Sequence, residues 1–139
     1  MKKLITVILF CCLGSVVFAQ KADDICGIYY MVDPFSKEGS QVEMYRASDG
    51  TYEAKVIWVE NPKKKPYLGL VFLKSLVYNK EKNEYQDGVV KYPGKKGTFS
   101  MTLWMESSTK LKVRGYWGFA ALGKTMYWTK ETKVRVQHD

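Results

Sequence analysis

The sequence has few of the residues on which most enzymes and metal sites depend. Its 139 residues include only three cysteines and one histidine. Two of the cysteines lie in an apolar N-terminal run, so Cys26 stands alone in the rest of the chain and cannot form an internal disulfide. His138 lies next to the C-terminus, where no catalytic unit with a Ser or Cys would hold it rigidly. We expect Cys26 to be a buried small hydrophobe, with a reactive thiol or an intermolecular bridge as the alternative.

Sequence motifs for catalysis are also missing. There is no Gly-x-Ser-x-Gly, no phosphate-binding loop and no paired-cysteine spacing. The carboxylates are scattered, with Asp23, Asp24, Asp87 and Glu106 far from a shared motif. An acid pair assembled by folding, as in glycosidases, is the alternative that stays open. We therefore expect a non-catalytic protein with no metal and no cofactor.

Residues 1–19 are typical of a secretory signal peptide. They combine a positively charged start with an apolar run over Leu4–Val17 and with Ala19 as a small residue for cleavage. The run is shorter than the about 20 apolar residues of a membrane-spanning helix, which favours cleavage over a retained anchor. Phe10 precedes the first cysteine of the run, where a lipoprotein signal would have a small residue. We expect residues 20–139 to be exported to the periplasm or the cell exterior.

Helical periodicity is almost absent, and short extended segments dominate. They follow one another at roughly 8 to 15 residues, with turn residues between them, and no repeat or linker divides the chain. Short, even strands favour a single antiparallel up-and-down β-barrel, which leaves no exposed sheet edge; a β-sandwich is the alternative. The charged tail 131–139 is expected to fray. The predicted strands are Gly27–Val32, Gln41–Arg46, Tyr52–Val59, Leu68–Lys74, Glu84–Tyr92, Thr98–Glu106, Lys110–Trp117 and Lys124–Lys130.

Turn chemistry supports these boundaries. Asp49-Gly50 predicts a two-residue hairpin, and Asp87-Gly88 predicts a bulge within its strand. Lys63–Lys65 predicts a basic turn.

Strict alternation would place Trp58 on the same face of its strand as Val56.

Aromatic residues are the strongest functional lead. Ten Tyr and four Trp exceed what a compact core of this size requires, so some of them are candidates for an aromatic-lined cavity with a few polar groups. Core packing is the alternative for each of them. The candidate ligand-binding residues are Trp58, Trp104, Tyr116, Trp117 and Trp128.

The positive charge suggests a different kind of partner. The chain has a formal net charge of +8, and loss of the two leader lysines lowers it to +6. Lysines gather at turns such as Lys63–Lys65 and Lys95-Lys96, where they are commonly solvated. Export argues against a nucleic-acid partner, whereas salt-sensitive contact with an anionic envelope surface stays open.

One segment, LKVRGYWGFAALGKTMYWTK over Leu111–Lys130, has an unusual spacing of glycines and aromatics. With PYLGLVFL and the Tyr92-Pro93 to Phe99 turn, it resembles the DUF2147 family, small exported bacterial proteins of unassigned function, over 27–130. The chain departs from the family at Gly27-Ile28-Tyr29, where the family usually has a tryptophan, and it has Lys63–Lys65 where the family often has an acidic loop. The Asp that usually precedes the family's proline is also missing at Tyr92-Pro93.

The resemblance implies a closed, lipocalin-type barrel that holds a small ligand. It also implies structural roles, with Gly115, Gly118 and Gly123 allowing close backbone passage. Arg114 would pack on Tyr29 as a late-strand cation on a first-strand aromatic. Replacing Gly115 or Gly123 by Val is therefore expected to cost several kcal/mol.

Two functions follow from this sequence. The first is non-catalytic binding of a small apolar or aromatic molecule in the barrel lumen, by a protein that acts as a monomer. The alternative is an envelope interaction protein with a plugged barrel, which engages a protein or an anionic polymer through its basic outer face. An open lumen favours the first, and a solid core would exclude it.

Overall fold

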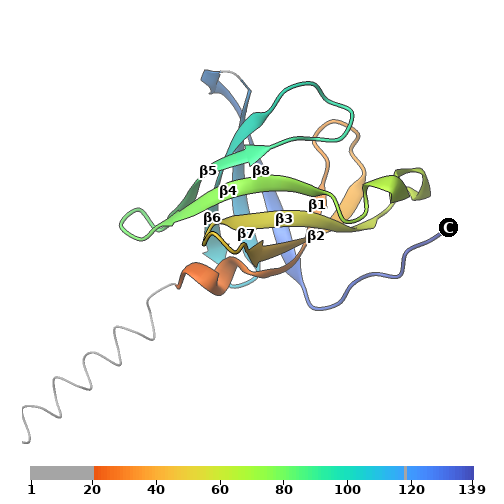
Figure 1. Ribbon diagram of the computed structural model, residues 1–139, viewed down its shortest axis with the longest axis horizontal. Coiled ribbons are helices and arrows are strands. Elements are labelled where there is room, and N and C mark those ends of the chain that lie inside the picture. Colours follow the sequence, from red (N-terminus) through yellow and green to blue (C-terminus); the bar gives the residue numbers. More distant parts are fainter. Residues whose placement is uncertain (1–20, 118) are drawn as a thin grey trace, which may run out of the picture.

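The computed structural model describes residues 21–117 and 119–139, with the backbone alone for 117 and 119–122. Eight antiparallel strands form a closed barrel in which each strand pairs with the next and the last returns to the first (Figure 1). The predicted up-and-down barrel is confirmed. The strands are β1 (Gly27–Val32), β2 (Gly39–Arg46), β3 (Tyr52–Val59), β4 (Val71–Asn79), β5 (Glu84–Val90), β6 (Phe99–Ser107), β7 (Lys110–Trp117) and β8 (Phe119–Glu131).

Two short 3-10 helices complete the fold. η1 (Ala22–Ile25) precedes β1, and η2 (Pro62–Tyr67) connects β3 to β4. The predicted basic turn lies within η2, which begins where the Asn61 side chain accepts a hydrogen bond from the Lys63 backbone N–H (3.0 Å). Because Gly69 then turns the chain with a φ of +88°, β4 begins three residues later than the sequence predicts. Within the described residues, no helix is long and apolar enough to cross a membrane.

The structure confirms the predicted bulge, whereas the predicted two-residue hairpin is wrong in its length. Asp87 has a φ of 65°, and the β5–β6 register shifts between Tyr85 and Gly88, as a bulge requires. A Cβ at Gly88 would lie 2.9 Å from the Met101 carbonyl oxygen. The β2–β3 hairpin also forms around Gly50, but it is longer than two residues, since the Ala47 N–H donates to the Thr51 carbonyl (2.8 Å).

A second bulge, which the sequence did not reveal, changes the face of Trp58. Gln41 pairs with Trp58 and the next residue, Val42, pairs with Val56, so Ile57 is the extra residue on β3. A one-residue insertion sends the following side chain to the opposite face. The prediction that Trp58 shares the inner face with Val56 is therefore wrong.

The C-terminal tail contacts the outer side of this bulge. The Trp58 indole donates to the Val136 carbonyl (3.0 Å), and the Gln137 carboxamide both accepts from Val59 N–H and donates to its carbonyl (2.9 Å each). Fully buried Gln41 accepts from the Arg135 backbone N–H (2.7 Å). The expectation that this tail frays is wrong, because it satisfies polar groups along β2 and β3.

One end of the barrel is closed by η1. Ile25 is fully buried, and its carbonyl accepts the hydroxyl of Tyr29 (2.8 Å). The Tyr85 hydroxyl donates to the Ala22 carbonyl (2.6 Å), and the Tyr52 hydroxyl donates to an Asp23 carboxylate. Three tyrosines of the barrel wall thus hold the helix in place.

Apolar side chains fill most of the interior between this plug and the opposite end. Trp128 is fully buried among them, 6.2 Å from Phe72 between ring centroids. Cys26 packs partly against this core, and burial is the main cause that raises the pKa of its thiol, followed by Asp23. The other core side chains include Tyr29, Met44, Leu73, Leu76, Tyr85, Met101, Leu103, Leu111 and Val113.

Candidate functional site

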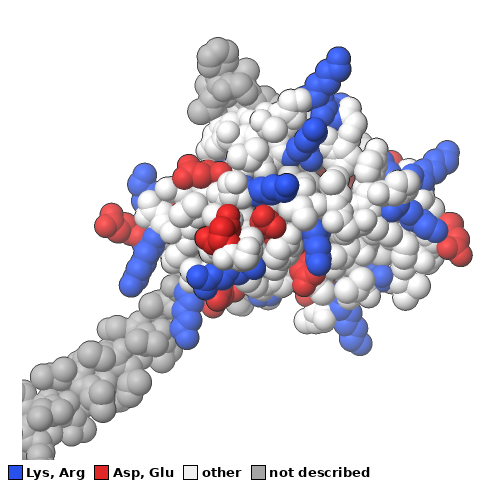
Figure 2. Space-filling model, viewed as in Figure 1, with Lys and Arg blue, Asp and Glu red and all other residues white. Residues whose placement is uncertain are grey.

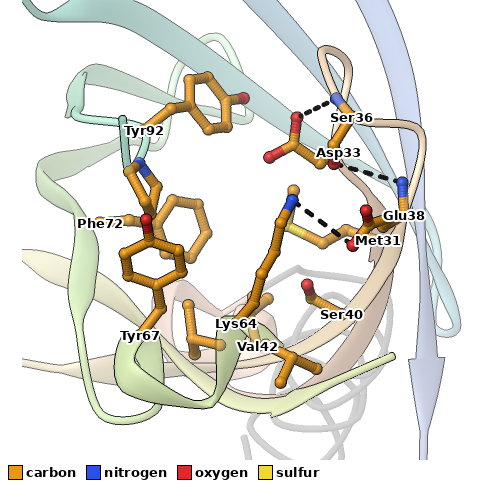
Figure 3. Close-up of a pocket in the computed structure, with 13 residues that line it drawn as sticks. Met31, Asp33, Ser36, Glu38, Ser40, Val42, Lys64, Tyr67, Phe72 and Tyr92 are labelled. Carbon is orange, nitrogen blue, oxygen red and sulfur yellow. Dashed lines mark hydrogen bonds and ion pairs between the residues drawn. The ribbon is translucent and has the colours of Figure 1, made fainter. Parts of the chain in front are cut away.

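A pocket of about 100 Å³ opens at the end of the barrel opposite η1. Its walls come from the end of β1, the β1–β2 loop and the start of β2, from the end of β3 with η2, and from the start of β4 and the segment after β5. These segments meet because the strands alternate in direction, so the loops after β1, β3 and β5 lie at one end. We call this the mouth pocket (Figure 3). Its lining residues are Met31, Asp33, Ser36, Glu38, Ser40, Val42, Val56, Val59, Lys64, Tyr67, Phe72, Tyr92 and Pro93.

The deep part of the mouth pocket is apolar and aromatic. Phe72 and Tyr92 stack with ring centroids 6.4 Å apart. Phe35, an exposed residue outside the lining, meets Tyr92 edge to face at 5.3 Å. Val42 and Val56 lie below them and belong to the barrel core. Such a surface favours a flat apolar group.

Charged groups line the pocket from opposite sides. The Glu38 carboxylate lies 3.5 Å from the Lys64 ammonium and accepts a hydrogen bond from the Asn61 amide (3.3 Å). One oxygen of Asp33 accepts the backbone N–H groups of Phe35 (2.7 Å) and Ser36 (3.1 Å). Within the described residues, Asp33 has no ion-pair partner.

Tyr92 places a polar atom beside this free carboxylate. Its side chain is 5% exposed, and Figure 3 shows its hydroxyl pointing toward Asp33. Burial, followed by the negative charge of Asp33, raises the pKa of Tyr92 above its ordinary value. The hydroxyl has no hydrogen-bond partner in the part of the chain that the structure describes. The phenol therefore stays protonated and free to bond to a molecule in the pocket.

Basic residues are more numerous than acidic ones around the molecule as a whole. Figure 2 shows lysine and arginine side chains spread over the visible face, with acidic side chains among them. The Lys95 ammonium lies 4.6 Å from the Phe35 ring centroid. A contact with Lys37 lowers the pKa of Lys124. The pocket thus opens onto a surface with solvated positive charges.

The structure does not bring the predicted ligand-binding aromatics together. Trp104 is on the outer face, where its indole donates to Glu84 (2.9 Å) and the Lys112 ammonium lies 5.6 Å from its ring. Tyr116, also outside the core, lies 5.7 Å from the Arg114 guanidinium. Trp128 is in the core beneath the mouth pocket, and Trp58 is under the tail. The side chain of Trp117 and all of Gly118 lie outside the described residues.

Arg114 does not pack on Tyr29, contrary to the expectation. Arg114 donates to the Thr125 hydroxyl on β8 (2.9 Å), on the outer face of the sheet. The cation nearest the Tyr29 ring is Lys130, whose ammonium lies 5.9 Å from the centroid. The stem of Lys130 crosses Gly27, where a Cβ would lie 2.7 Å from Lys130 Cε. A late-strand cation thus lies near the Tyr29 ring, but it is Lys130 on β8 and not Arg114 on β7.

Gly115 and Gly123 differ in the space around them. A Cβ at Gly123 would lie 2.9 Å from the Gly115 carbonyl oxygen and 2.7 Å from Arg114 Nε, so close approach explains this residue. A Cβ at Gly115 would meet only Met126 Cε at 3.9 Å, which is an ordinary contact. The expected high cost of a side chain therefore applies to Gly123 and not to Gly115.

Sequence reasoning missed the mouth pocket because its lining comes from several strands and from three separate connections, with no shared motif. The available signal was topological. In an up-and-down barrel, Asp33, Lys64 and Tyr92 must lie at one end, since they follow β1, β3 and β5. Among the described residues, no cluster of His, Cys, Asp and Glu side chains has the geometry to hold a metal ion.

Comparison with known proteins agrees with this architecture. A solved structure, described as protein HP1028 from the human pathogen Helicobacter pylori and assigned to the lipocalin family, aligns with a TM-score of 0.62 and 20% identity, over 78% of this chain and 83% of that chain. At this identity the likeness shows the fold alone. A search of curated proteins finds no match. The family model "Uncharacterized protein conserved in bacteria (DUF2147)" matches residues 27–130, and the chain therefore belongs to the DUF2147 family.

Proposed function

We propose that this protein is an exported, monomeric, non-catalytic binding protein that takes a small molecule with one apolar or aromatic group into the mouth pocket. The observation that carries the proposal is the pocket itself, with Phe72, Tyr92 and Val56 in its depth and a few polar groups nearer its entrance. Concave apolar sites with a small number of polar groups are typical of small-molecule binding. Lipocalin-like barrels are suited to small-molecule binding because the open end of the barrel leads into its interior.

The size of the pocket limits the ligand. About 100 Å³ is close to the space of one aromatic ring, since an apolar cavity of ~150 Å³ accommodates a benzene. The core beneath, with Trp128 and Leu103, is closed to solvent. The ligand is therefore a one-ring or short-chain molecule whose head group remains at the entrance, and not a long fatty acid threaded through the barrel.

Native mass spectrometry of protein purified from its own host tests binding directly. We expect a reproducible small-molecule adduct that is lost on denaturation. Ser40, a half-buried pocket residue on β2, offers a blocking variant, because Ser40→Phe would fill the space above Val42. The matched control is Ser100→Phe on the outer side of β6. An adduct on the control but not on Ser40→Phe supports the proposal, and repeated absence from the wild type contradicts it.

Export rests on residues 1–19, which lie outside the described residues. N-terminal sequencing of the protein from the periplasmic fraction or the medium should begin at Gln20. A full-length chain retained in the cytoplasm would contradict this part of the proposal.

The second candidate is contact with an anionic polymer through the outer face of β7. Lys110, Lys112 and Arg114 alternate along this strand, and Lys112 has Trp104 and Tyr127 as its direct cross-strand neighbours. Retention on a sulfated-polysaccharide column, weakened by salt and by Lys112→Glu, supports this function. Elution with a neutral protein of similar size contradicts it.

A further inference from the structure

We infer that the mouth pocket selects a small organic cation, an ammonium group attached to an aromatic or short apolar body. The inference rests on the proposed function and adds to it the charge of the ligand. It depends on three features of the pocket: an uncompensated carboxylate, an unpartnered phenol beside it, and aromatic rings around both.

The carboxylate that remains uncompensated is that of Asp33. Glu38 and Lys64 neutralise each other across 3.5 Å, so their pair contributes no net charge to the pocket. Asp33 uses one oxygen for two backbone N–H groups, and the structure gives its second oxygen no partner among the described residues. A half-buried carboxylate in this state is more stable when a cation binds it.

The surroundings of Asp33 suit an organic cation better than a hydrated metal ion. Tyr67, Phe72 and Tyr92 present rings to the pocket, and ring faces attract ammonium groups. The Tyr92 side chain is 5% exposed, and its hydroxyl has no partner among the described residues. It can therefore accept a hydrogen bond from an ammonium that also bonds to Asp33. The apolar depth of the pocket then receives the body of the same molecule.

The lysines outside the pocket would favour an anionic ligand over a cationic one. Lys37, Lys95 and Lys124 favour anions in the surrounding solvent, but they are solvated, and charges in solvent are screened within about 10 Å at 0.1 M salt. Asp33 and Tyr92 would be in direct contact with the ligand, where screening is weak. At physiological salt the contact groups therefore determine selectivity.

Three probes of nearly equal shape separate charge from size. Benzylammonium, benzyl alcohol and benzoate each carry one ring and one head group, and their affinities can be measured by ligand-observed NMR or calorimetry in 0.15 M salt. We expect benzylammonium to bind about fivefold to tenfold more tightly than benzyl alcohol, the scale of the difference between a charge-assisted and a neutral hydrogen bond, and benzoate to bind most weakly.

Asp33→Asn tests the residue responsible. The amide keeps an acceptor for the Phe35 and Ser36 N–H groups, so the turn is retained while the charge is removed. The matched control is Asp49→Asn at the other end of the barrel, because Asp49 accepts the Thr51 N–H in a similar turn (3.0 Å). We expect Asp33→Asn to abolish the preference for benzylammonium over benzyl alcohol, and Asp49→Asn to preserve it.

The outcomes separate this inference from the proposed function. Tightest binding by benzoate would assign selectivity to Lys64 and overturn the inference, while pocket binding itself would stand. Equal affinities for all three probes, or an unchanged preference in Asp33→Asn, would also overturn it. If none of the probes binds at millimolar concentration, both the inference and the one-ring pocket are contradicted.

Discussion

The two ends of this barrel use the same residue type in opposite ways. At the η1 end, the hydroxyls of Tyr29, Tyr52 and Tyr85 each bond to a group of residues 22–25. At the mouth, the Tyr92 side chain is 5% exposed, and its hydroxyl has no partner among the described residues. Buried polar groups are normally satisfied. The difference fits our proposal that one end stabilises the barrel and the other binds a small molecule.

The largest effect should come from loosening the plug. Ile25→Ala removes a fully buried side chain and is expected to lower the free energy of unfolding by about 3 kcal/mol. Denaturant unfolding measures this loss. Val77→Ala, at a 44% exposed position on β4, serves as the control and should change stability by less than about 0.5 kcal/mol. A similarly small loss for Ile25→Ala would mean that η1 does not support the barrel.

Removal of the tail should have a smaller effect. Deletion of residues 134–139 exposes Trp58 and leaves both backbone groups of Val59 without the Gln137 carboxamide. We expect a loss of about 2 kcal/mol in unfolding free energy, from lost burial and hydrogen bonds. Deletion of Asp139 alone is the control and should leave the melting temperature unchanged. An equal melting temperature for both deletions would show that the tail is not docked in solution.

Tyr→Phe substitutions, which remove one hydroxyl each, test the difference between the η1 end and the mouth most finely. Tyr52→Phe and Tyr85→Phe should each lose about 1 kcal/mol of unfolding free energy, because each leaves a plug acceptor without its donor. Tyr92→Phe should stay within about 0.5 kcal/mol of the wild type, since no intramolecular bond is lost. A loss at Tyr92 equal to that at Tyr52 would remove the distinction between the two ends.

The strand pattern was predictable from sequence because alternation and turn residues act locally. The ends of β1, β3 and β7 match the predicted Gly27–Val32, Tyr52–Val59 and Lys110–Trp117. The bulge at Ile57 was not predictable, because neither glycine nor asparagine marks it. It appears only when β2 and β3 pair, and it moves Trp58 from the inner to the outer face.

The site was less predictable than the fold. Tryptophans attracted attention because they are large and rare, yet none of the residues that line the mouth pocket is a tryptophan. Asp33, Lys64 and Tyr92 are ordinary loop residues whose importance depends on which strands meet. Docking of the tail depends likewise on buried Gln41, whose partners lie about 90 positions away in the chain. No local pattern reports such contacts.

An amide NMR titration with benzylammonium tests the central difference between the two ends most directly. We expect chemical-shift changes that saturate and that concentrate at mouth residues such as Asp33, Ser40 and Phe72, with no change at Ile25 or at other residues of the η1 end. Changes that concentrate around η1 or along the outer face of β7, with the mouth unaffected, would contradict it.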